Sequence, residues 1–234
     1  MESNPEILPF SSAETMAAHL ADIVEAKILS ILQNKKNCNL ALSGGSTPYP
    51  LYTDLATRAI DWSRIQASLV DERWVPNDHS RSNEAFVRGA FSKASLFELK
   101  SVYSEDSTID ETIVAQNKNY HKDSRSPDIV ILGMGTDGHT ASWFPHAEGL
   151  NHAMVSDELY CSVTAKKSAI TGDEVERVTM TLFAIASASM IVLMIAGDEK
   201  KKTYHDAVSM ESIEDMPIRA ILNARPDMLV CWAP

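Results

Sequence analysis

Apolar residues recur at helical intervals through residues 20–32, which predicts an amphipathic helix. Ser11 and Glu14 stand just before this pattern with the spacing of a capping box, so we expect the helix to begin beside them. A short apolar run at 39–42 follows, then a loop at 43–48 and a second helical pattern over 50–59. The first part of the chain therefore predicts a helix, and then a strand, a loop and a helix.

Short apolar runs return along the rest of the chain, each long enough for a buried strand. They cover residues 67–70, 128–132, 159–164, 190–195 and 228–232, and several precede a helical pattern. Such alternation predicts an α/β fold: one three-layer, Rossmann-like domain over residues 1–234, with a doubly wound, mainly parallel sheet and helices on both faces. The polar stretches at 104–110, 121–127 and 166–176 are expected to be loops.

The composition narrows the possible partners. The formal charge of −11 disfavours a general nucleic-acid binder, because phosphate backbones are held by clustered lysines and arginines. An anionic ligand would have to meet local positive groups. Three widely spaced cysteines, Cys38, Cys161 and Cys231, suit a reducing compartment and are expected in the core.

The chain has no pattern typical of a secreted or membrane protein. Residues 1–5 lack a basic stretch followed by an apolar one, so we expect no secretory signal. The longest apolar run, residues 190–196, is far shorter than the roughly 20 residues of a membrane helix. We therefore expect a cytoplasmic protein without a membrane partner. We also expect it to be either a monomer or a weak homodimer.

The loop at 43–48, Ser-Gly-Gly-Ser-Thr-Pro, is the first candidate site. Gly44 and Gly45 would let backbone N–H groups approach a ligand, and Thr47 is a possible cap for the next helix, with Pro48 in its first turn. These features suit a cradle for an oxyanion or a phosphate, and they suit a tight turn with an ordinary cap equally well. The loop lacks the Gly-Lys-Ser/Thr ending of a nucleoside triphosphate site.

Charged residues follow the next strand directly, in Asp71-Glu72-Arg73. Arg73 can hold a phosphate through two hydrogen bonds, although an ion pair within the segment is the simpler explanation. Pro76 prevents further regular strand pairing. Asn83, near the start of a predicted helix, is either a ligand contact or a turn residue.

Residues 133–145 carry the most information. Gly133, Gly135 and Gly138 match the dinucleotide-binding fingerprint literally. That fingerprint opens a long helix, whereas Pro145 allows only a short helical turn. We therefore reject a dinucleotide site.

The same loop would present His139 at a strand end, with Asp137 close enough to orient it. Histidine can take a proton from water and return it near neutral pH, and a structural histidine is the alternative. We expect no metal, because His139, His146 and His152 lack a compact ligand spacing. A serine nucleophile is not supported either, since no Gly-x-Ser-x-Gly segment is present.

Arg177 and Lys200 are two further cationic candidates. Lys200 follows the strand predicted at 190–195 and lies at a helix start, where its charge opposes the helix dipole unless an anion is bound. Lys201 and Lys202 are expected on a solvated helix face.

Together these segments resemble the 6-phosphogluconolactonase family, which belongs to the larger glucosamine-6-phosphate isomerase/deaminase superfamily. The resemblance is carried, in chain order, by SGGSTP at 43–48, DERWVP at 71–76, SNEAF at 82–86, GMGTDGHTASWFP at 133–145, RVTMT at 177–181 and GDEK at 197–200. It implies hydrolysis of 6-phosphoglucono-1,5-lactone to 6-phosphogluconate in the pentose phosphate pathway, without a metal or organic cofactor.

The resemblance also implies roles for individual residues. His139 matches the family's catalytic histidine, which we expect to deprotonate the attacking water while N–H groups near Gly44 and Gly45 stabilise the oxyanion. Contacts to phosphate and sugar are implied for Gly45, Ser46, Thr47, Arg73, Arg177 and Lys200. Trp143 stands where the family usually has leucine, and we expect it to change the packing beneath the loop more than the chemistry.

Two alternatives stay open. A glucosamine-6-phosphate deaminase uses a histidine in a similar loop, but that family continues as GHIAFNEP and carries Asp-Glu-Tyr where this chain has Asp71-Glu72-Arg73. A non-catalytic sugar-phosphate sensor on the same fold would not need His139.

Overall fold

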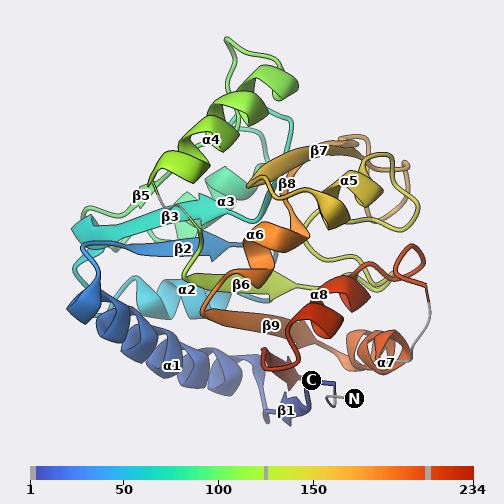
Figure 1. The fold of residues 1–234 in the computed structure, drawn as a ribbon. Coiled ribbons are helices and arrows are strands. Elements are labelled where there is room, and N and C mark those ends of the chain that lie inside the picture. Colours follow the sequence, from blue (N-terminus) through green and yellow to red (C-terminus); the bar gives the residue numbers. More distant parts are fainter. Residues whose placement is uncertain (1–3, 124–125, 209–211) are drawn as a thin grey trace.

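The computed structural model describes residues 4–123, 126–208 and 212–234. Its main sheet has seven strands in the order β1-β10-β9-β6-β2-β3-β5 (Figure 1). These strands are β1 (Ile7–Pro9), β10 (Leu229–Ala233), β9 (Met190–Ala196), β6 (Ile129–Gly133), β2 (Cys38–Leu42), β3 (Ile65–Leu69) and β5 (Glu98–Leu99). Every pairing between neighbours is parallel, which confirms the predicted sheet.

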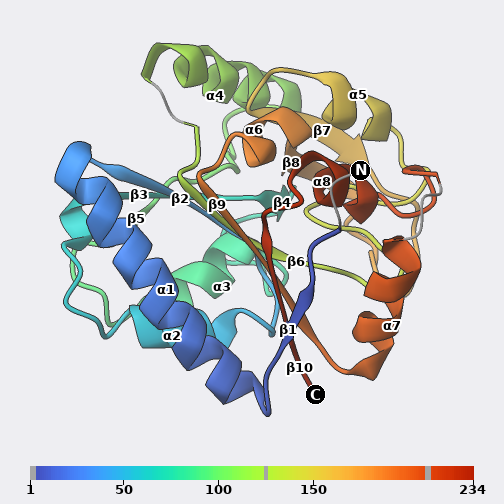
Figure 2. The ribbon, with the colours of Figure 1, turned by 60° about the horizontal axis from the view of Figure 1, so that its bottom comes forward.

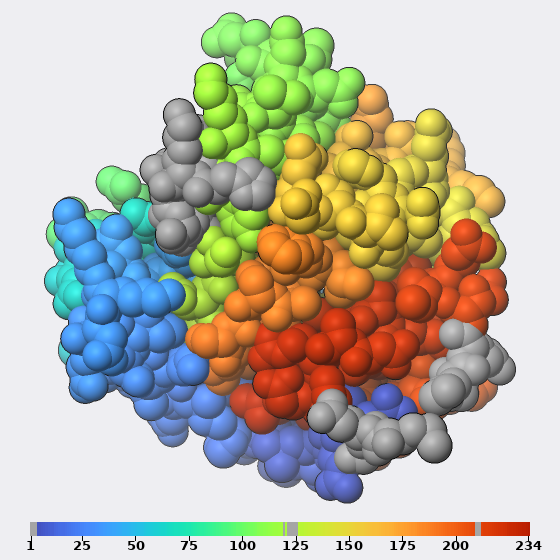
Figure 3. All heavy atoms as spheres, in the orientation of Figure 1, coloured from blue at the N-terminus to red at the C-terminus, as the bar shows by residue number. Residues whose placement is uncertain are grey.

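Helices cover both faces of this sheet, as predicted (Figure 2). One face carries α1 (Ala13–Asn34), α2 (Tyr49–Leu55) and α3 (Asn83–Ala90), and the other carries α6 (Leu182–Ala186) and α8 (Ile218–Ala224). The remaining helices are α4 (Ile109–Asp123), α5 (Leu150–Val155), α7 (Asp198–Ala207) and the 3-10 turn Trp62–Arg64. Figure 3 shows α6 and α8, in orange and red, side by side on the surface of this face. Because both faces are covered, central strands such as β6 consist of buried apolar residues.

The first helix begins one residue later than the expected cap. Ser12 is its N-cap: the Ser12 hydroxyl accepts a hydrogen bond from the Thr15 N–H at 3.2 Å, and the Thr15 hydroxyl accepts one from the Ser12 N–H at 3.1 Å. The capping box predicted for Ser11 and Glu14 is therefore wrong by one position, because the threonine hydroxyl reaches back to the N-cap in place of the glutamate.

A second, antiparallel sheet of three strands lies beside the main one. It contains β4 (Asp71–Arg73), β8 (Glu176–Met180) and β7 (Tyr160–Thr164), in that order. The run at 159–164 thus forms a strand as predicted, but outside the parallel sheet. Since side chains alternate along β4, Asp71 and Arg73 share one face while Glu72 points to the other.

Two boundaries also differ from those expected. Helix α2 ends at Leu55, short of the expected 59, and α4 continues to Asp123. The loop predicted at 121–127 therefore starts later, and residues 124–125 of it lie outside the described part of the chain. The three cysteines are free and buried, which confirms their place in the core.

The parallel sheet brings the chemically rich loops to one edge. Strands β2, β6 and β9 end at Leu42, Gly133 and Ala196, and each continues into one of the candidate segments. Since parallel strands share the direction of their carboxyl ends, these loops meet on the same side of the sheet. In the described residues, no helix combines the length and the apolar character needed to cross a membrane.

Candidate active site

One cavity of about 350 Å³ lies among these loops. Most of the site residues expected from the sequence line it: Gly44, Gly45, Ser46, Thr47, Arg73, His139 and Lys200. The other lining residues are Ser43, Pro48, Asp71, Asn83, Gly133, Met134, Gly135, Thr136, Ala141 and Ile170. The structure therefore brings together segments that lie more than a hundred residues apart in the chain.

His139 enters the cavity from a tight turn after β6. The Gly138 N–H donates to the Gly135 carbonyl at 3.1 Å, and the Gly135 N–H donates to the His139 carbonyl at 2.9 Å. Gly138 has a φ of +78°, in the left-handed region that glycine adopts most easily. The helix required by a dinucleotide fingerprint is absent from this described segment, since the next helix, α5, begins only at Leu150.

Gly135 makes room for the histidine. A β-carbon at this position would lie 2.6 Å from Oδ1 of Asp137 and closer still to Nδ1 and Cε1 of His139. Only a residue without a side chain allows the imidazole and carboxylate to pack against this backbone. The glycine pattern that mimics a nucleotide-binding loop thus serves the packing of the His139 side chain.

Asp137 orients the imidazole of His139. Its Oδ1 lies 2.5 Å from Nδ1 of His139 and also accepts the His139 backbone N–H at 3.2 Å. Burial raises the pKa of Asp137, but the hydrogen bond and the charge of His139 outweigh this effect and bring the pKa below its usual value. The carboxylate is therefore ionised and favours the tautomer with a proton on Nδ1, which leaves the lone pair on Nε2.

Phe144 packs against the same imidazole. The two ring centroids are 4.5 Å apart, and Phe144 is almost completely buried. The guanidinium carbon of Arg177 lies 5.5 Å from the centroid of the same phenyl ring. His139 is thus held between a carboxylate and an aromatic ring, which limits its motion.

The glycine loop presents unpaired backbone donors to the cavity. The N–H groups of Gly44, Gly45, Ser46 and Thr47 have no hydrogen-bond acceptor among the described residues. Gly45 has a φ of +102°, in the left-handed region that glycine adopts most easily. Such a group of N–H donors suits an oxyanion or a phosphate.

Thr47 is not the cap of the following helix. The N-cap of α2 is Pro48, and no side chain caps it, so the prediction that Thr47 fills this position is wrong. The reason is that α2 begins one residue later, at Tyr49. Thr47 instead lines the cavity wall.

Two cationic side chains reach the cavity. Arg73 donates from Nη1 to the carbonyl of Arg81, while its buried Nε has no partner among the described residues. Lys200 lies in the first turn of α7, as predicted, and burial lowers its pKa. These local charges are what an anionic ligand requires on a chain with a net charge of −11.

Arg177 differs from the other predicted contacts. It stands opposite Arg73 in the pairing of β4 with β8, is only 1% exposed and does not line the cavity. Its Nη2 donates to the carbonyl of Thr171 at 2.9 Å. Burial, and then the charge of Arg73, lower the pKa of Arg177 to about 10. In this arrangement Arg177 adds positive charge behind Arg73.

Among the ten other lining residues, three come from outside the two glycine-rich loops. Asp71 shares a face of β4 with Arg73, and a two-residue alternation would have revealed it once β4 was recognised as a strand. Asn83, left open between ligand contact and turn residue, starts α3 and also lines the cavity. Ile170 comes from the loop before β8, and no sequence signal marks it.

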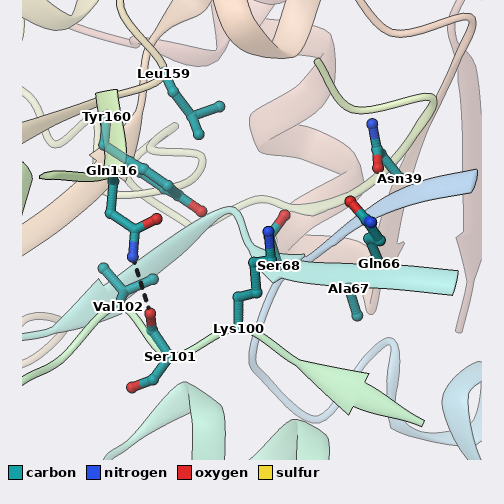
Figure 4. A pocket seen from close by; sticks show the side chains of 10 residues that line it. All are labelled: Asn39, Gln66, Ala67, Ser68, Lys100, Ser101, Val102, Gln116, Leu159 and Tyr160. Atoms are coloured by element: carbon teal, nitrogen blue, oxygen red, sulfur yellow. Dashed lines mark hydrogen bonds between the residues drawn. The ribbon is translucent and has the colours of Figure 1, made fainter. Parts of the chain in front are cut away.

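A second cavity lies away from these residues, between β3, β7 and α4 (Figure 4). Its polar side chains include Gln116, whose amide donates to the carbonyl of Ser101 at 3.1 Å. Its volume of about 30 Å³ is close to that of a single water, far too small for a sugar phosphate. Across the described residues, no three histidine, cysteine, aspartate or glutamate side chains gather as metal ligands.

Known proteins resemble this chain over its whole length. Residues 11–231 match the family model described as glucosamine-6-phosphate isomerases/6-phosphogluconolactonase. The chain is 34% identical to a 6-phosphogluconolactonase of Rhizobium meliloti, over 100% of both chains. It is 33% identical to one of Pseudomonas aeruginosa, over 96% of this chain and 93% of that one. Among solved structures, a 6-phosphogluconolactonase from Shewanella baltica superposes with a TM-score of 0.91 at 29% identity, over 100% of both chains.

Proposed function

This chain belongs to the glucosamine-6-phosphate isomerase/6-phosphogluconolactonase family as a lactone hydrolase, and we propose that it opens 6-phosphogluconolactone with His139 as the general base. The product is 6-phosphogluconate, in the oxidative branch of the pentose phosphate pathway. The observation that carries the mechanism is a carboxylate-oriented histidine in the same cavity as four unpaired backbone N–H groups.

In the proposed reaction, Nε2 of His139 takes a proton from a water as its oxygen attacks C1 of the lactone. Asp137 stabilises the imidazolium that forms, because its ionised carboxylate accepts a hydrogen bond from the Nδ1–H group, which keeps its proton. The C1–O5 bond then breaks, and the imidazolium returns the proton to the departing ring oxygen. The histidine is thereby restored, and no cofactor is needed for the balance of the step.

In this proposal the backbone donors bind the reacting carbonyl oxygen, and the cations bind the phosphate end of the substrate. N–H groups of Gly44 and Gly45 stabilise the negative oxygen of the tetrahedral intermediate. Ser46, Thr47, Arg73 and Lys200 hold the phosphate and sugar, with Arg177 adding charge behind them. Binding through the remote phosphate fixes C1 near the water, so part of the binding energy supports the reaction.

The proposal extends to the protein's organisation and location. It includes one domain over residues 1–234, which the single hydrophobic core of the described residues supports, and a monomer or weak homodimer. A cytoplasmic location is supported by three free, buried cysteines. Gel filtration over a range of protein concentrations measures the oligomeric state.

The test is hydrolysis of freshly generated 6-phosphogluconolactone, with the spontaneous rate subtracted. We expect a large excess over that rate, saturable in substrate. Ammonia release from glucosamine 6-phosphate would replace this assignment with a deaminase. Tight binding of 6-phosphogluconate with no turnover of the lactone would replace it with a sensor.

A further inference from the structure

Asp71 is a carboxylate in a cavity whose other charged side chains, Arg73 and Lys200, are positive. A phosphate-binding site gains nothing from a negative group, because like charges repel. Asp71 is also only 8% exposed, and burying a carboxylate is costly unless it accepts hydrogen bonds. Its presence therefore calls for donors on the protein, on the ligand or on both.

The protein supplies some of these donors and fixes the carboxylate in place. The Ser142 hydroxyl donates to Oδ2 of Asp71 at 2.6 Å, from the same loop as His139. The Asn83 amide donates to the Asp71 backbone carbonyl at 2.8 Å and reaches Oδ1 at 3.4 Å. Asn83 is itself held against Gly44, where a β-carbon would lie 2.5 Å from the Asn83 Cγ.

The carboxylate keeps unused acceptor capacity. A carboxylate offers about four lone-pair sites, and the strong bond from Ser142 occupies only one of them. Among the described residues Asp71 forms no ion pair within 4 Å, although its charge acts on Arg177 and partly offsets the lowering of that residue's pKa. Nη1 of Arg73 donates to the Arg81 carbonyl. Oδ1, with one long hydrogen bond, is the better acceptor for a ligand.

We propose that Asp71 is a specificity-determining residue that accepts a hydrogen bond from a ring hydroxyl of the phosphosugar lactone. The chemistry of the ligand fits, because its hydroxyl groups are neutral donors that a carboxylate attracts, whereas its phosphate is repelled toward Arg73 and Lys200. The inference rests on the proposed function for the identity of the lactone, and it adds how the cavity distinguishes a hydroxylated ring from a deoxygenated one.

The expected selectivity is substantial. A site built to bind a hydroxyl rejects an analogue that lacks it, because a buried polar group then loses its partner. For a hydrogen bond to a charged acceptor, we expect a loss of about tenfold to a hundredfold in kcat/KM when the matching hydroxyl is removed.

The experiment compares 6-phosphogluconolactone with three lactones that lack the hydroxyl at C2, C3 or C4. The wild-type protein should show the loss at one position, and Asp71→Asn should reduce it to less than about threefold, since an amide is a weaker acceptor than a carboxylate. The matched control is Asp78→Asn, an exposed aspartate after β4, which should keep the wild-type preference. Circular dichroism and thermal melting verify that both variants fold.

Two results would overturn the inference. One is a uniform decrease for all four lactones in Asp71→Asn, which would indicate a structural role. The other is loss of turnover with the hydroxyl preference intact, which would place Asp71 in the chemistry.

A binding experiment covers the case in which Asp71→Asn does not fold. Calorimetry measures the affinity of the wild-type protein for 6-phosphogluconate and for its three deoxy counterparts, and equal affinity for all four would exclude the inference. These measurements distinguish failure of the hydroxyl recognition from failure of the proposed function. If the lactone is not hydrolysed but one deoxy acid binds at least tenfold more weakly than 6-phosphogluconate, the proposed function is wrong and the hydroxyl recognition stands. If all lactones are hydrolysed alike, only the role of Asp71 is lost.

Discussion

The backbone of Gly135 lies directly against the imidazole of His139, in space that any β-carbon would fill. Gly135 has no side chain that could take part in the reaction, yet this contact makes the orientation of the proposed base, His139, depend on it. It therefore provides a way to move the histidine without removing it.

We expect Gly135→Ala to lower kcat by at least about a hundredfold, because a displacement of about 1 Å is enough to cost that much in a positioned reaction. The melting temperature should change little, since the added methyl meets a side chain and not packed backbone. Gly89→Ala is the control: no atom lies within 4 Å of its β-carbon position, so activity should be retained. Unchanged turnover in Gly135→Ala would contradict the packing described here.

Removing the base tests the chemistry itself. His139→Ala should reduce kcat by about a hundredfold to ten-thousandfold, the usual contribution of general acid–base catalysis. The control is His152→Ala, since the His152 side chain is 60% exposed and lies outside the cavity. Rates come from the same corrected lactone assay, and near-wild-type turnover would remove His139 from the mechanism.

The pH dependence of binding tests Lys200. Burial lowers the pKa of Lys200, and the protonated form is the one that attracts phosphate. Affinity for 6-phosphogluconate should therefore be highest below this pKa and fall as pH rises through it, earlier than for an exposed lysine. Lys200→Met should bind more weakly at pH 7.5 and lose this alkaline decline. Lys202→Met, which changes an exposed lysine on the same helix, should keep both, as measured by calorimetry.

Glu72 offers a test of stability. Its buried carboxylate accepts the N–H groups of Arg73, Asn83 and Glu84, at 2.7, 2.8 and 2.7 Å, and the Ser82 hydroxyl at 3.0 Å. Glu72→Gln would turn an amide donor toward N–H groups, so we expect unfolding to cost about 2 kcal/mol less free energy.

Urea denaturation measures this difference. Glu105→Gln, at an exposed turn position, should leave the unfolding free energy unchanged within about 0.5 kcal/mol. Equal stability of the two variants would show that the four hydrogen bonds to Glu72 contribute little.

A substitution of Trp143 tests whether this side chain contributes to the stability of the protein without contributing to catalysis. It is fully buried, and its Nε1 donates to the Met180 carbonyl at 2.9 Å. Trp143→Leu should destabilise the protein by about 2–4 kcal/mol, through a cavity and an unpaired carbonyl. The kcat of the folded variant should stay within about threefold of wild type at low temperature. Trp74→Leu, at a partly exposed position, should destabilise less.

The sequence predicted the parts of the fold whose signals are local. The apolar run before Gly133 and the glycines around His139 located a strand, a tight turn and an imidazole that lines the cavity. The partner of a strand is not a local property, because it depends on loops that close over long distances. The strand at 160–164 has the same apolar character as those of the main sheet, yet it pairs with β8.

The same limit applies to the site. Asp71 and Glu72 are adjacent charged residues, and only the alternation along β4 sends one to the cavity and the other to the start of α3. The charge of Arg177 and the family resemblance led us to expect a ligand contact there, and its pairing opposite Arg73 buries the side chain outside the cavity lining. The residue types were enough to suggest the chemistry of the site. The direction in which each side chain points could be predicted only from the pairing of the strands.

The order of the strands also determines when the sheet can be completed as the chain is made. β1, the edge strand at Ile7–Pro9, pairs only with β10 at Leu229–Ala233, and β10 in turn covers β9. A ribosome delivers β1 first, and its partner follows almost the whole chain later. During synthesis, β1 therefore has no strand to join, and β9 presents an open edge to other nascent chains until β10 docks. For this protein, covering the open edge of β9 depends on the insertion of a single late strand.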